Sequence, residues 1–457
     1  MPRRLAPAAA TIAVTAVLLA GCTTSDEEAS PAGSSSGAAA KAATSSGVFD
    51  ASTTHTISVE IDDDDFAAMV ATYLDSGDKG WITGTVTIDG QTFTDVGLKL
   101  KGNSTLRGVS ADSTPESLPW RIRLDKDVDG QDIDGYSDFV VRANTSATSM
   151  NEAVALDLLR EAGLATEQAI ATRFSVNGSA DQLTLVLQNL DDTWQEENFD
   201  DDGILYKAEA EGDYSYRGTD AADYATAFSV EAGDEDYEPL IEFLDFVNTS
   251  SDEEFAAELG EHLDVEAFAR YLALEDLIDN FDDIDGPGNN SFLEYDATTD
   301  AFTVVAWDHN LAFGTRNVGG GGGGAGGGGD RPERPQGGAP DGAAPAGQPA
   351  GGQVGGQGGG RGGQSGNNQL VTRFKADATF KALYDEATTD LRAQLLDGGQ
   401  LDDAVDAWSA VLTEGAGDLV DAATIAQEGD AIRAYADETT GSATSGSATT
   451  DSSTAAG

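Results

Sequence analysis

The sequence LIDNFDDIDGPGNNSFLEYDATTDAFTVVAWDHNLAFG, residues 277–314, sets carboxylates and asparagines around two short apolar runs. Alternating apolar residues predict a strand at Ser291–Tyr295 and a second strand at Phe302–Trp307, joined by a turn. Such a hairpin brings Asn290, before the first strand, near Asp308, after the second strand. Oxygen ligands at these ends, with further carboxylates one loop away, are typical of a site for Mg²⁺ and a phosphate group.

The order of polar residues in this stretch is similar to that of the protein-kinase site, where a base aspartate, an asparagine and a metal-holding aspartate follow one another. Here Asp282, Asp283 or Asp285 stands first, followed by Asn290 and Asp308. The kinase pattern H-R-D-x-x-x-x-N, counted back from the asparagine, nominates Asp285 as the base. The His-Arg pair is missing and Asp-His-Asn replaces Asp-Phe-Gly, so the motif is not that of an ordinary kinase. A surface hairpin with a solvated acidic loop is the alternative interpretation.

The composition is strongly acidic, with 81 Asp and Glu residues against 25 Lys and Arg residues and a formal net charge of −56 over 457 residues. This charge excludes nucleic acids and disfavours anionic membrane surfaces as partners, because a basic footprint for phosphate backbones is missing. It is typical of a salt-tolerant secreted protein, or of one whose substrate is basic. Hydrophobic residues make up 39% of the chain, which allows a core in its middle part.

The N-terminus is predicted to be a targeting segment. A basic start, an apolar run at residues 5–20 and the lipobox Leu19-Ala20-Gly21-Cys22 predict a lipoprotein signal peptide over residues 1–22. Cys22 is the predicted lipidation site, which places the protein outside the cytoplasm, anchored by lipid to a bacterial cell membrane. The alternative, a cleaved signal peptide or short membrane anchor, also exports the chain. Because Cys22 is the only cysteine, no disulfide can form within the chain.

Composition also divides the rest of the chain into ordered and low-complexity parts. Residues 23–53 are predicted to be a disordered tether, and residues 54–317 a folded domain. Residues 318–368 are dominated by glycine and are predicted to be a disordered insertion, after which residues 369–437 supply further helices of the same domain. The Ser/Thr-rich tail at residues 438–457 is predicted to be disordered.

Within the domain, strands come first and helices later, which predicts an α+β fold. Asp89-Gly90 and Asn177-Gly178 lie between alternating apolar runs, a pattern that predicts tight hairpin turns. Besides the acidic hairpin, the expected strands are 56–61, 81–88, 93–100, 119–124, 139–143, 169–176, 183–187 and 203–208. The expected helices are one that ends at residue 74, then 150–162, 239–246, 252–259, 265–279, 369–374, 378–396, 402–412 and 419–435.

The stretch Asp125-Lys126-Asp127-Val128-Asp129-Gly130 matches the opening half of an EF-hand calcium loop. The final ligand position of such a loop would be Tyr136 instead of glutamate, and no pair of flanking helices is predicted. An acidic β-turn is therefore the favoured interpretation, and a calcium site the alternative.

Several blocks of the sequence together resemble the CotH family, the spore coat protein H-like atypical kinases. They are LKLKGNST at 98–105, WRIRLD at 120–125, MNEA at 150–153, LYK at 205–207, NFD at 280–282, Asn290 before an aromatic strand, and AWD at 306–308. Their order and spacing carry the resemblance, since no single block is decisive. It spans about residues 54–314 and resumes at 370–374, so the Gly-rich tract looks like an insertion.

The resemblance implies an atypical protein-kinase-like, two-lobed fold with a β-rich N-terminal part and a helical C-terminal part. It also implies binding of ATP and Mg²⁺ (or Mn²⁺) and phosphorylation of Ser or Thr in protein partners. The acidity of the chain suits a basic acceptor, and the tails at residues 23–47 and 438–457 suggest the alternative that the chain phosphorylates itself. By position, Asp282 would be the base, ahead of Asp283, and Asn290 and Asp308 would be metal ligands. This assignment differs from the spacing argument, which favours Asp285.

Lys101 and Arg123, in the β-rich part, are the candidates to contact the phosphates, and Glu152 is a candidate partner for one of them. The alternative for all three is ordinary surface charge, since Glu152 also suits a helix N-terminus. The rival function is a non-catalytic cell-surface, adhesion or envelope scaffold with the same fold, stabilised by Ca²⁺. The acidity, the lipobox and the half calcium loop all suit that second function.

Overall fold

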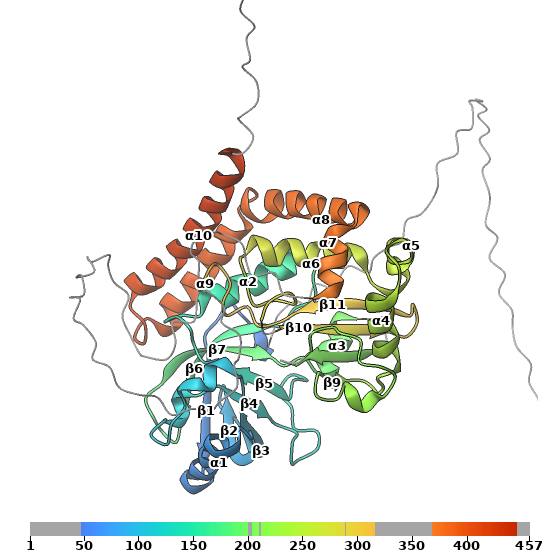
Figure 1. The fold of residues 1–457 in the computed structure, drawn as a ribbon. Coiled ribbons are helices and arrows are strands. Elements are labelled where there is room, and N and C mark those ends of the chain that lie inside the picture. Colours follow the sequence, from blue (N-terminus) through green and yellow to red (C-terminus); the bar gives the residue numbers. More distant parts are fainter. Residues whose placement is uncertain (1–46, 200–202, 210–211, 288, 316–367, 446–457) are drawn as a thin grey trace, which may run out of the picture. The chain divides into compact units, whose positions relative to one another are not determined.

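The computed structural model describes residues 47–199, 203–209, 212–287, 289–315 and 368–445 (Figure 1). The predicted signal peptide with Cys22 and the Gly-rich tract up to residue 367 lie outside these residues. The predicted tether ends earlier than expected, because Val48 and Phe49 are buried in a hydrophobic core. Among the residues described, no helix combines the length and apolar character needed to cross a bilayer.

The β-rich first part is a closed barrel, drawn in blue to green in Figure 1. Its strands are β1 (His55–Ile61), β2 (Ile82–Ile88), β3 (Gln91–Leu100), β4 (Trp120–Arg123), β5 (Asp138–Val141), β6 (Ala169–Val176) and β7 (Gln182–Gln188). They are ordered β1-β2-β3-β4-β5-β7-β6, and β1 closes the barrel by parallel pairing with β6. Successive side chains of a strand face opposite sides of the sheet. Residues such as Val59, Leu98 and Phe139 therefore fill the interior of the barrel, and their immediate neighbours on the same strand face outward.

A second sheet of four strands, ordered β11-β10-β8-β9, carries the acidic hairpin. Its strands are β8 (Ile204–Ala208), β9 (Phe228–Ala232), β10 (Ser291–Asp296) and β11 (Ala301–Ala306). Ser291 pairs with Ala306, so the chain at Asn290 and the chain at Asp308 leave the same end of the β10–β11 pair. The predicted hairpin is therefore confirmed.

The later part of the chain is mainly helical, which confirms the predicted α+β class with strands first and helices later. Helices α1 (Asp63–Ser76), α2 (Met150–Glu161) and α3 (Asp192–Asn198) lie between strands in the sequence. The later helices are α4 (Glu238–Thr249), α5 (Asp252–His262), α6 (Val265–Leu277), α7 (Gln369–Ala376), α8 (Ala378–Leu391), α9 (Gln400–Ala416) and α10 (Ala422–Ser445). A π-helical turn at Arg392–Leu396 continues α8. Helix α10 runs past residue 438, where a disordered tail was predicted, because extending a helix that is already formed costs far less than starting one.

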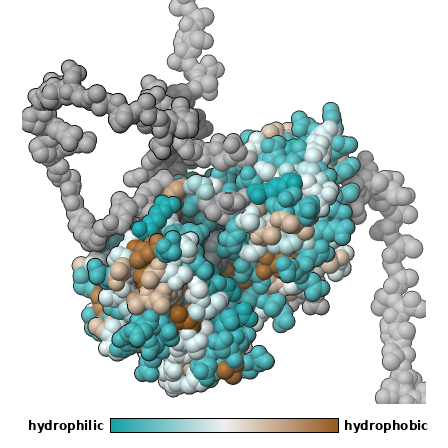
Figure 2. Space-filling view, turned by 60° about the horizontal axis from the view of Figure 1, so that its bottom comes forward, coloured by the Kyte–Doolittle hydropathy of each residue, from teal (hydrophilic) through white to brown (hydrophobic). Residues whose placement is uncertain are grey.

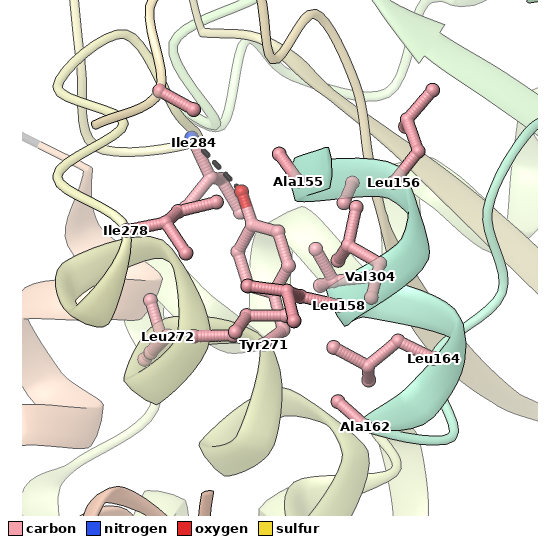
Figure 3. Packing of buried hydrophobic residues seen from close by; sticks show 14 of the residues in the cluster. Ala155, Leu156, Leu158, Ala162, Leu164, Tyr271, Leu272, Ile278, Ile284 and Val304 are labelled. Atoms are coloured by element: carbon pink, nitrogen blue, oxygen red, sulfur yellow. Dashed lines mark hydrogen bonds between the residues drawn. The ribbon is translucent and has the colours of Figure 1, made fainter. Parts of the chain in front are cut away.

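The main hydrophobic core holds the acidic loop between α6 and β10 in place. In this core Tyr271 of α6 packs with Leu158 of α2 (Figure 3). The Tyr271 hydroxyl accepts a hydrogen bond of 3.1 Å from the backbone N–H of Ile284. Ile284 is fully buried, so the core holds the middle of the loop between Asp283 and Asp285.

The described surface is mainly polar. Figure 2 shows one face on which hydrophilic residues predominate and hydrophobic residues occur in small groups. Among the large hydrophobic residues of the described segments, the exposed ones are Leu74 and Val128. Val128 belongs to the half calcium loop, which forms turns between β4 and β5, as the β-turn interpretation expects.

Candidate functional site

A buried arginine joins the barrel, helix α2 and the acidic hairpin. Arg142 directly follows β5, and its guanidinium donates hydrogen bonds of 2.5 and 2.9 Å to the two carboxylate oxygens of Glu152 in α2. The same guanidinium forms an ion pair with Asp308, which lies beyond the end of β11. The side chains of Arg142 and Glu152 are only 12% and 2% exposed, so this pair is held largely away from water, whereas Asp308 is 28% exposed and reaches the solvent.

The surroundings of the triad fix its protonation. Burial alone would raise the pKa of Asp308, but the Arg142 guanidinium outweighs burial and lowers that pKa. Burial raises the pKa of Glu152, and Arg142 offsets part of this rise. Asp308 is thus an anion throughout the neutral pH range.

A second buried ion pair lies next to the triad. His309 Nε2 is 2.9 Å from Glu275 Oε1, and both side chains are buried. Burial would lower the pKa of His309, but the Glu275 carboxylate outweighs burial and raises the pKa to about 9. The pair connects the end of α6 to the residue after Asp308, so both ends of the acidic stretch are fixed relative to each other.

Asn290 ties the acidic loop to the hairpin. Its side-chain amide donates a hydrogen bond of 2.8 Å to the backbone carbonyl of Asp282, which leaves the amide oxygen of Asn290 as an acceptor. Asp308 has a φ of 66°, in the left-handed region that residues other than glycine seldom adopt. Such backbone strain is common where a side chain is aimed for function. The hairpin therefore brings the Asp282 segment, Asn290 and Asp308 to one end.

The other two candidate bases lie in different surroundings. The backbone N–H of Asp285 donates a 2.9 Å hydrogen bond to Asp283 Oδ1. Burial, followed by repulsion from Glu275, raises the pKa of Asp283 to about 8, so this carboxyl is mainly protonated at pH 7. Burial also raises the pKa of Asp285. A carboxyl that is already protonated cannot accept a proton, so this environment disfavours Asp283 as a base at neutral pH.

Basic side chains gather beside Trp307 and Asp308. Lys101, which follows β3, donates a 3.0 Å hydrogen bond to Asn189 Oδ1, and its ammonium lies 5.0 Å from the centre of the Trp307 ring. Burial, followed by repulsion from Lys207 and Arg121, lowers the pKa of Lys101 to about 7. In a chain of net charge −56, several cations close enough to repel one another mark a place that suits an anion.

The arginine of β4 that belongs to this group is Arg121, whereas the sequence pointed to Arg123. Arg121 is 14% exposed and makes a 2.7 Å ion pair with Asp138. Arg123 is 43% exposed and pairs with Asp125 at 2.9 Å, inside the half calcium loop. The two arginines are two residues apart on β4 and therefore face the same side of the sheet, so the sequence alone does not distinguish them.

The partner of Glu152 also differs from the expectation, which named Lys101 or Arg123. Its partner is Arg142, because the chain leaves β5 directly in front of the first turn of α2. A sequence signal for Arg142 exists: it ends the apolar run Phe139-Val140-Val141 and precedes Glu152 by 10 residues. The His309–Glu275 pair has no comparable signal, since 34 residues separate its members.

At the hairpin end, Asp308 and Asn290 are the oxygen donors that would hold a metal ion shared with a phosphate ligand. Among the described residues, no group of three or more His, Cys, Asp or Glu side chains is placed to hold a metal by itself. Mg²⁺ is usually bound through one or two carboxylates together with substrate phosphates and water, whereas Ca²⁺ takes about six to eight oxygen ligands. An ionised Asp308 and the amide oxygen of Asn290 match the Mg²⁺ pattern.

Comparison with known proteins identifies the family. The profile of the family described as CotH kinase protein matches residues 98–428, which is more than half of the chain. The chain belongs to the CotH family. Inner spore coat protein H of Bacillus subtilis (strain 168) is 25% identical over 172 residues, covering 36% of this chain and 46% of the relative. The aligned stretch therefore spans less than half the length of that relative.

The CotH match confirms the resemblance seen in the sequence and changes its limits. It includes all candidate site residues from Lys101 to Asp308 as well as the Gly-rich tract. It begins after residue 54, where the resemblance was taken to start, and it extends beyond residue 374 into α10. The helices after the Gly-rich tract are thus part of the CotH region.

Proposed function

We propose that this CotH-family chain is an extracytoplasmic protein kinase that transfers the γ-phosphate of ATP to Ser or Thr of protein partners in the presence of Mg²⁺ or Mn²⁺. The observation that carries the proposal is the bridge that Arg142 makes between Glu152 of α2 and Asp308 at the hairpin end. A cation that joins a helix glutamate to an ionised aspartate, beside further basic residues, suits the placement of a metal-bound triphosphate. Family membership gives the proposal further support.

In this proposal Asp308 and Asn290 would hold the metal ion, which when bound neutralises phosphate charge that the acidic loop would otherwise repel. Lys101 and Arg121 would bind phosphate oxygens from the barrel side, and Arg142 keeps Asp308 ionised and oriented. Asp282 would orient the acceptor hydroxyl and take up its proton, since its backbone is fixed by Asn290.

The proposal extends to the arrangement of the fold. The barrel with α2 would correspond to the β-rich lobe of a kinase-like fold, and the helices from α4 onward to its helical lobe. The support is that Arg142 and Glu152 come from the first part and Asp308 from the second, yet they form one ion triad. The acceptor would be a Ser or Thr in a basic protein or in the chain's own tails, because the acidic surface attracts basic segments.

We also propose that the chain is exported and held at the bacterial membrane by a lipid on Cys22. The support is the lipobox in the sequence, together with the name of the relative, which refers to a spore coat. A lipid anchor would keep the site on the outer side of the membrane. Salt there would screen the mutual repulsion of the acidic surface residues.

The test is transfer of labelled γ-phosphate from ATP to a basic protein by the full chain, with Mg²⁺ and with Mn²⁺. Asp308→Asn and Asp282→Asn preserve side-chain shape and should each lower the rate by about 100-fold or more. Asp397→Asn, at an exposed position after the π-helical turn, is the matched control and should leave the rate unchanged. A wild-type chain that transfers no phosphate with either metal and whose melting temperature is unaffected by ATP would contradict the proposal and favour a non-catalytic scaffold.

A further inference from the structure

The segment that leads from Arg142 into α2 is held by a carboxylate from the far end of the chain. Glu428 of α10 accepts hydrogen bonds from the Ser146 hydroxyl and the Ala147 N–H at 2.9 Å each, and from the Thr148 N–H at 3.0 Å. The Thr148 hydroxyl also donates to the same carboxylate. Three of these donors bond Oε2 of Glu428 and one bonds Oε1, so both carboxylate oxygens are tied to the segment 146–148.

Helix α2 has no conventional N-terminal cap, and Glu428 indirectly supplies one. Ser149, at the cap position, makes no capping hydrogen bond with its side chain and has a φ of 53°, in the left-handed region. The first helical N–H, of Met150, donates instead to the Thr148 hydroxyl at 3.1 Å, and Glu428 orients that hydroxyl. A negative charge near a helix N-terminus is also favoured by the helix dipole.

The same segment contacts the residues that follow Asp308. The Thr145 hydroxyl and the Asn151 side-chain amide both donate to the backbone carbonyl of Asn310, at 3.2 and 2.7 Å. Glu152, the partner of Arg142, is the next residue after Asn151. The start of α2 therefore lies between α10 on one side and the Asp308–Asn310 segment on the other.

Close packing at the next residue of α10 makes this contact rigid. A Cβ atom added to Gly429 would lie 2.9 Å from Val405 of α9 and 3.6 Å from the sulfur of Met150. Gly429 thus lets α10 pack closely against α9, and at the same point α10 lies in van der Waals range of Met150 at the start of α2. Ile425 and Ile432, one turn to either side, are buried in the main core and fix the helix against rotation.

We propose that Glu428 is a positioning residue for the site: it sets the start of α2 and through it the Glu152–Arg142–Asp308 triad. Helix α10, which follows the Gly-rich tract, then contributes to the geometry of the site, because it supplies this carboxylate. Glu428 contacts none of the proposed phosphate or metal groups and acts through α2. This inference deepens the proposed function and rests on it for its kinetic consequence, whereas its structural consequence is independent of that function.

The test compares Glu428→Ala, Glu428→Gln and the control Asp430→Asn in the full chain. Glutamine keeps the size of the side chain, but either orientation of its amide sets an NH2 group against the N–H of Ala147 or of Thr148. Both Glu428 variants should therefore speed backbone hydrogen exchange in the first turn of α2 and at 309–312 by about ten-fold or more, and Asp430→Asn should not. A variant Glu428→Gln with wild-type exchange at these amides would show that only packing matters and would overturn the proposal.

The kinetic arm separates this inference from the proposed function. In both Glu428 variants the kcat for phosphate transfer should fall by about ten-fold while the KM for the acceptor stays unchanged, since the acceptor does not contact Glu428. Faster exchange with unchanged kcat would overturn the positioning role. If the wild-type chain transfers no phosphate, the exchange result alone still decides whether Glu428 sets the start of α2, so failure of the two proposals can be told apart.

Discussion

Lys101 is held away from water beside Trp307, and its titration gives a prediction at the scale of one residue. Because its pKa is lowered to about 7, its ammonium form is present below pH 7 and is lost as the pH rises above that value. An anionic ligand binds the charged form, so the affinity of the chain for Mg-ATP should fall by up to about ten-fold per pH unit above about pH 7. Titration calorimetry across this range measures the dissociation constant at each pH.

Lys101→Arg provides the matched control for this pH dependence, since arginine stays charged throughout the range. The variant should bind Mg-ATP with an affinity that is nearly constant above pH 7. Equal pH slopes for the wild type and Lys101→Arg would contradict the assignment of Lys101 to the phosphate group of the ligand.

The sequence nominated site residues only where a motif carried them. Asp282, Asn290 and Asp308 stand in a recognisable order, and the hairpin register does bring Asn290 and Asp308 to one end. Arg142 was missed, although it ends an apolar strand, because a single arginine at that position has no motif of its own. Which carboxyl of the acidic loop is ionised depends on burial by residues distant in sequence, and the sequence does not encode this locally.

At the scale of elements, the start of α7 gives a second prediction. The Asn368 side chain caps α7 by accepting from the N–H groups of Leu370 and Val371 at 3.0 and 3.3 Å. Its amide also donates a 3.1 Å hydrogen bond to the carbonyl of Ile284 in the acidic loop. Asn368→Ala removes both functions and should lower the free energy of unfolding by about 1–3 kcal/mol, measured by urea denaturation.

Asp377→Ala is the control for this substitution, because Asp377 caps α8 at 2.8 and 3.2 Å without contact to the acidic loop. It should cost about 1 kcal/mol, as the loss of a cap does. Only Asn368→Ala should also reduce phosphate transfer, since only it releases the loop. Similar transfer rates in the two variants would contradict a role of α7 in fixing the loop.

Elements with local signals were predictable, and elements that depend on distant pairing were not. The Asp89-Gly90 turn has φ values of 46° and 86°, as a tight hairpin turn requires, and β2 and β3 pair around it. The parallel pairing of β1 with β6 joins His55–Val59 to Thr172–Val176, and no local pattern announces it. Strand β9 was missed although its five residues, FSVEA, alternate between apolar and polar side chains, and its pairing with β8 includes a register shift.

At the scale of the whole molecule, the proposed export of the chain makes a third prediction. Cells that express the full chain should incorporate a labelled fatty acid into it, because the lipobox presents Cys22 for acylation. Cys22→Ser should abolish the label, and no other cysteine can replace it. A wild-type chain without label, detected by gel fluorescence after coupling of an alkyne-tagged acid, would contradict the lipid anchor.

The central claim is that the Arg142-centred triad serves phosphate transfer, and one rate comparison tests it most directly. Glu152→Gln keeps the shape of the side chain but removes the carboxylate charge that pairs with Arg142. Arg142 would then pair with Asp308 alone. Labelled γ-phosphate transfer by the full chain should fall by about ten-fold or more in Glu152→Gln, whereas Glu161→Gln, exposed at the other end of α2, should transfer at the wild-type rate. Equal rates for all three chains, or no transfer by the wild type, would contradict the account.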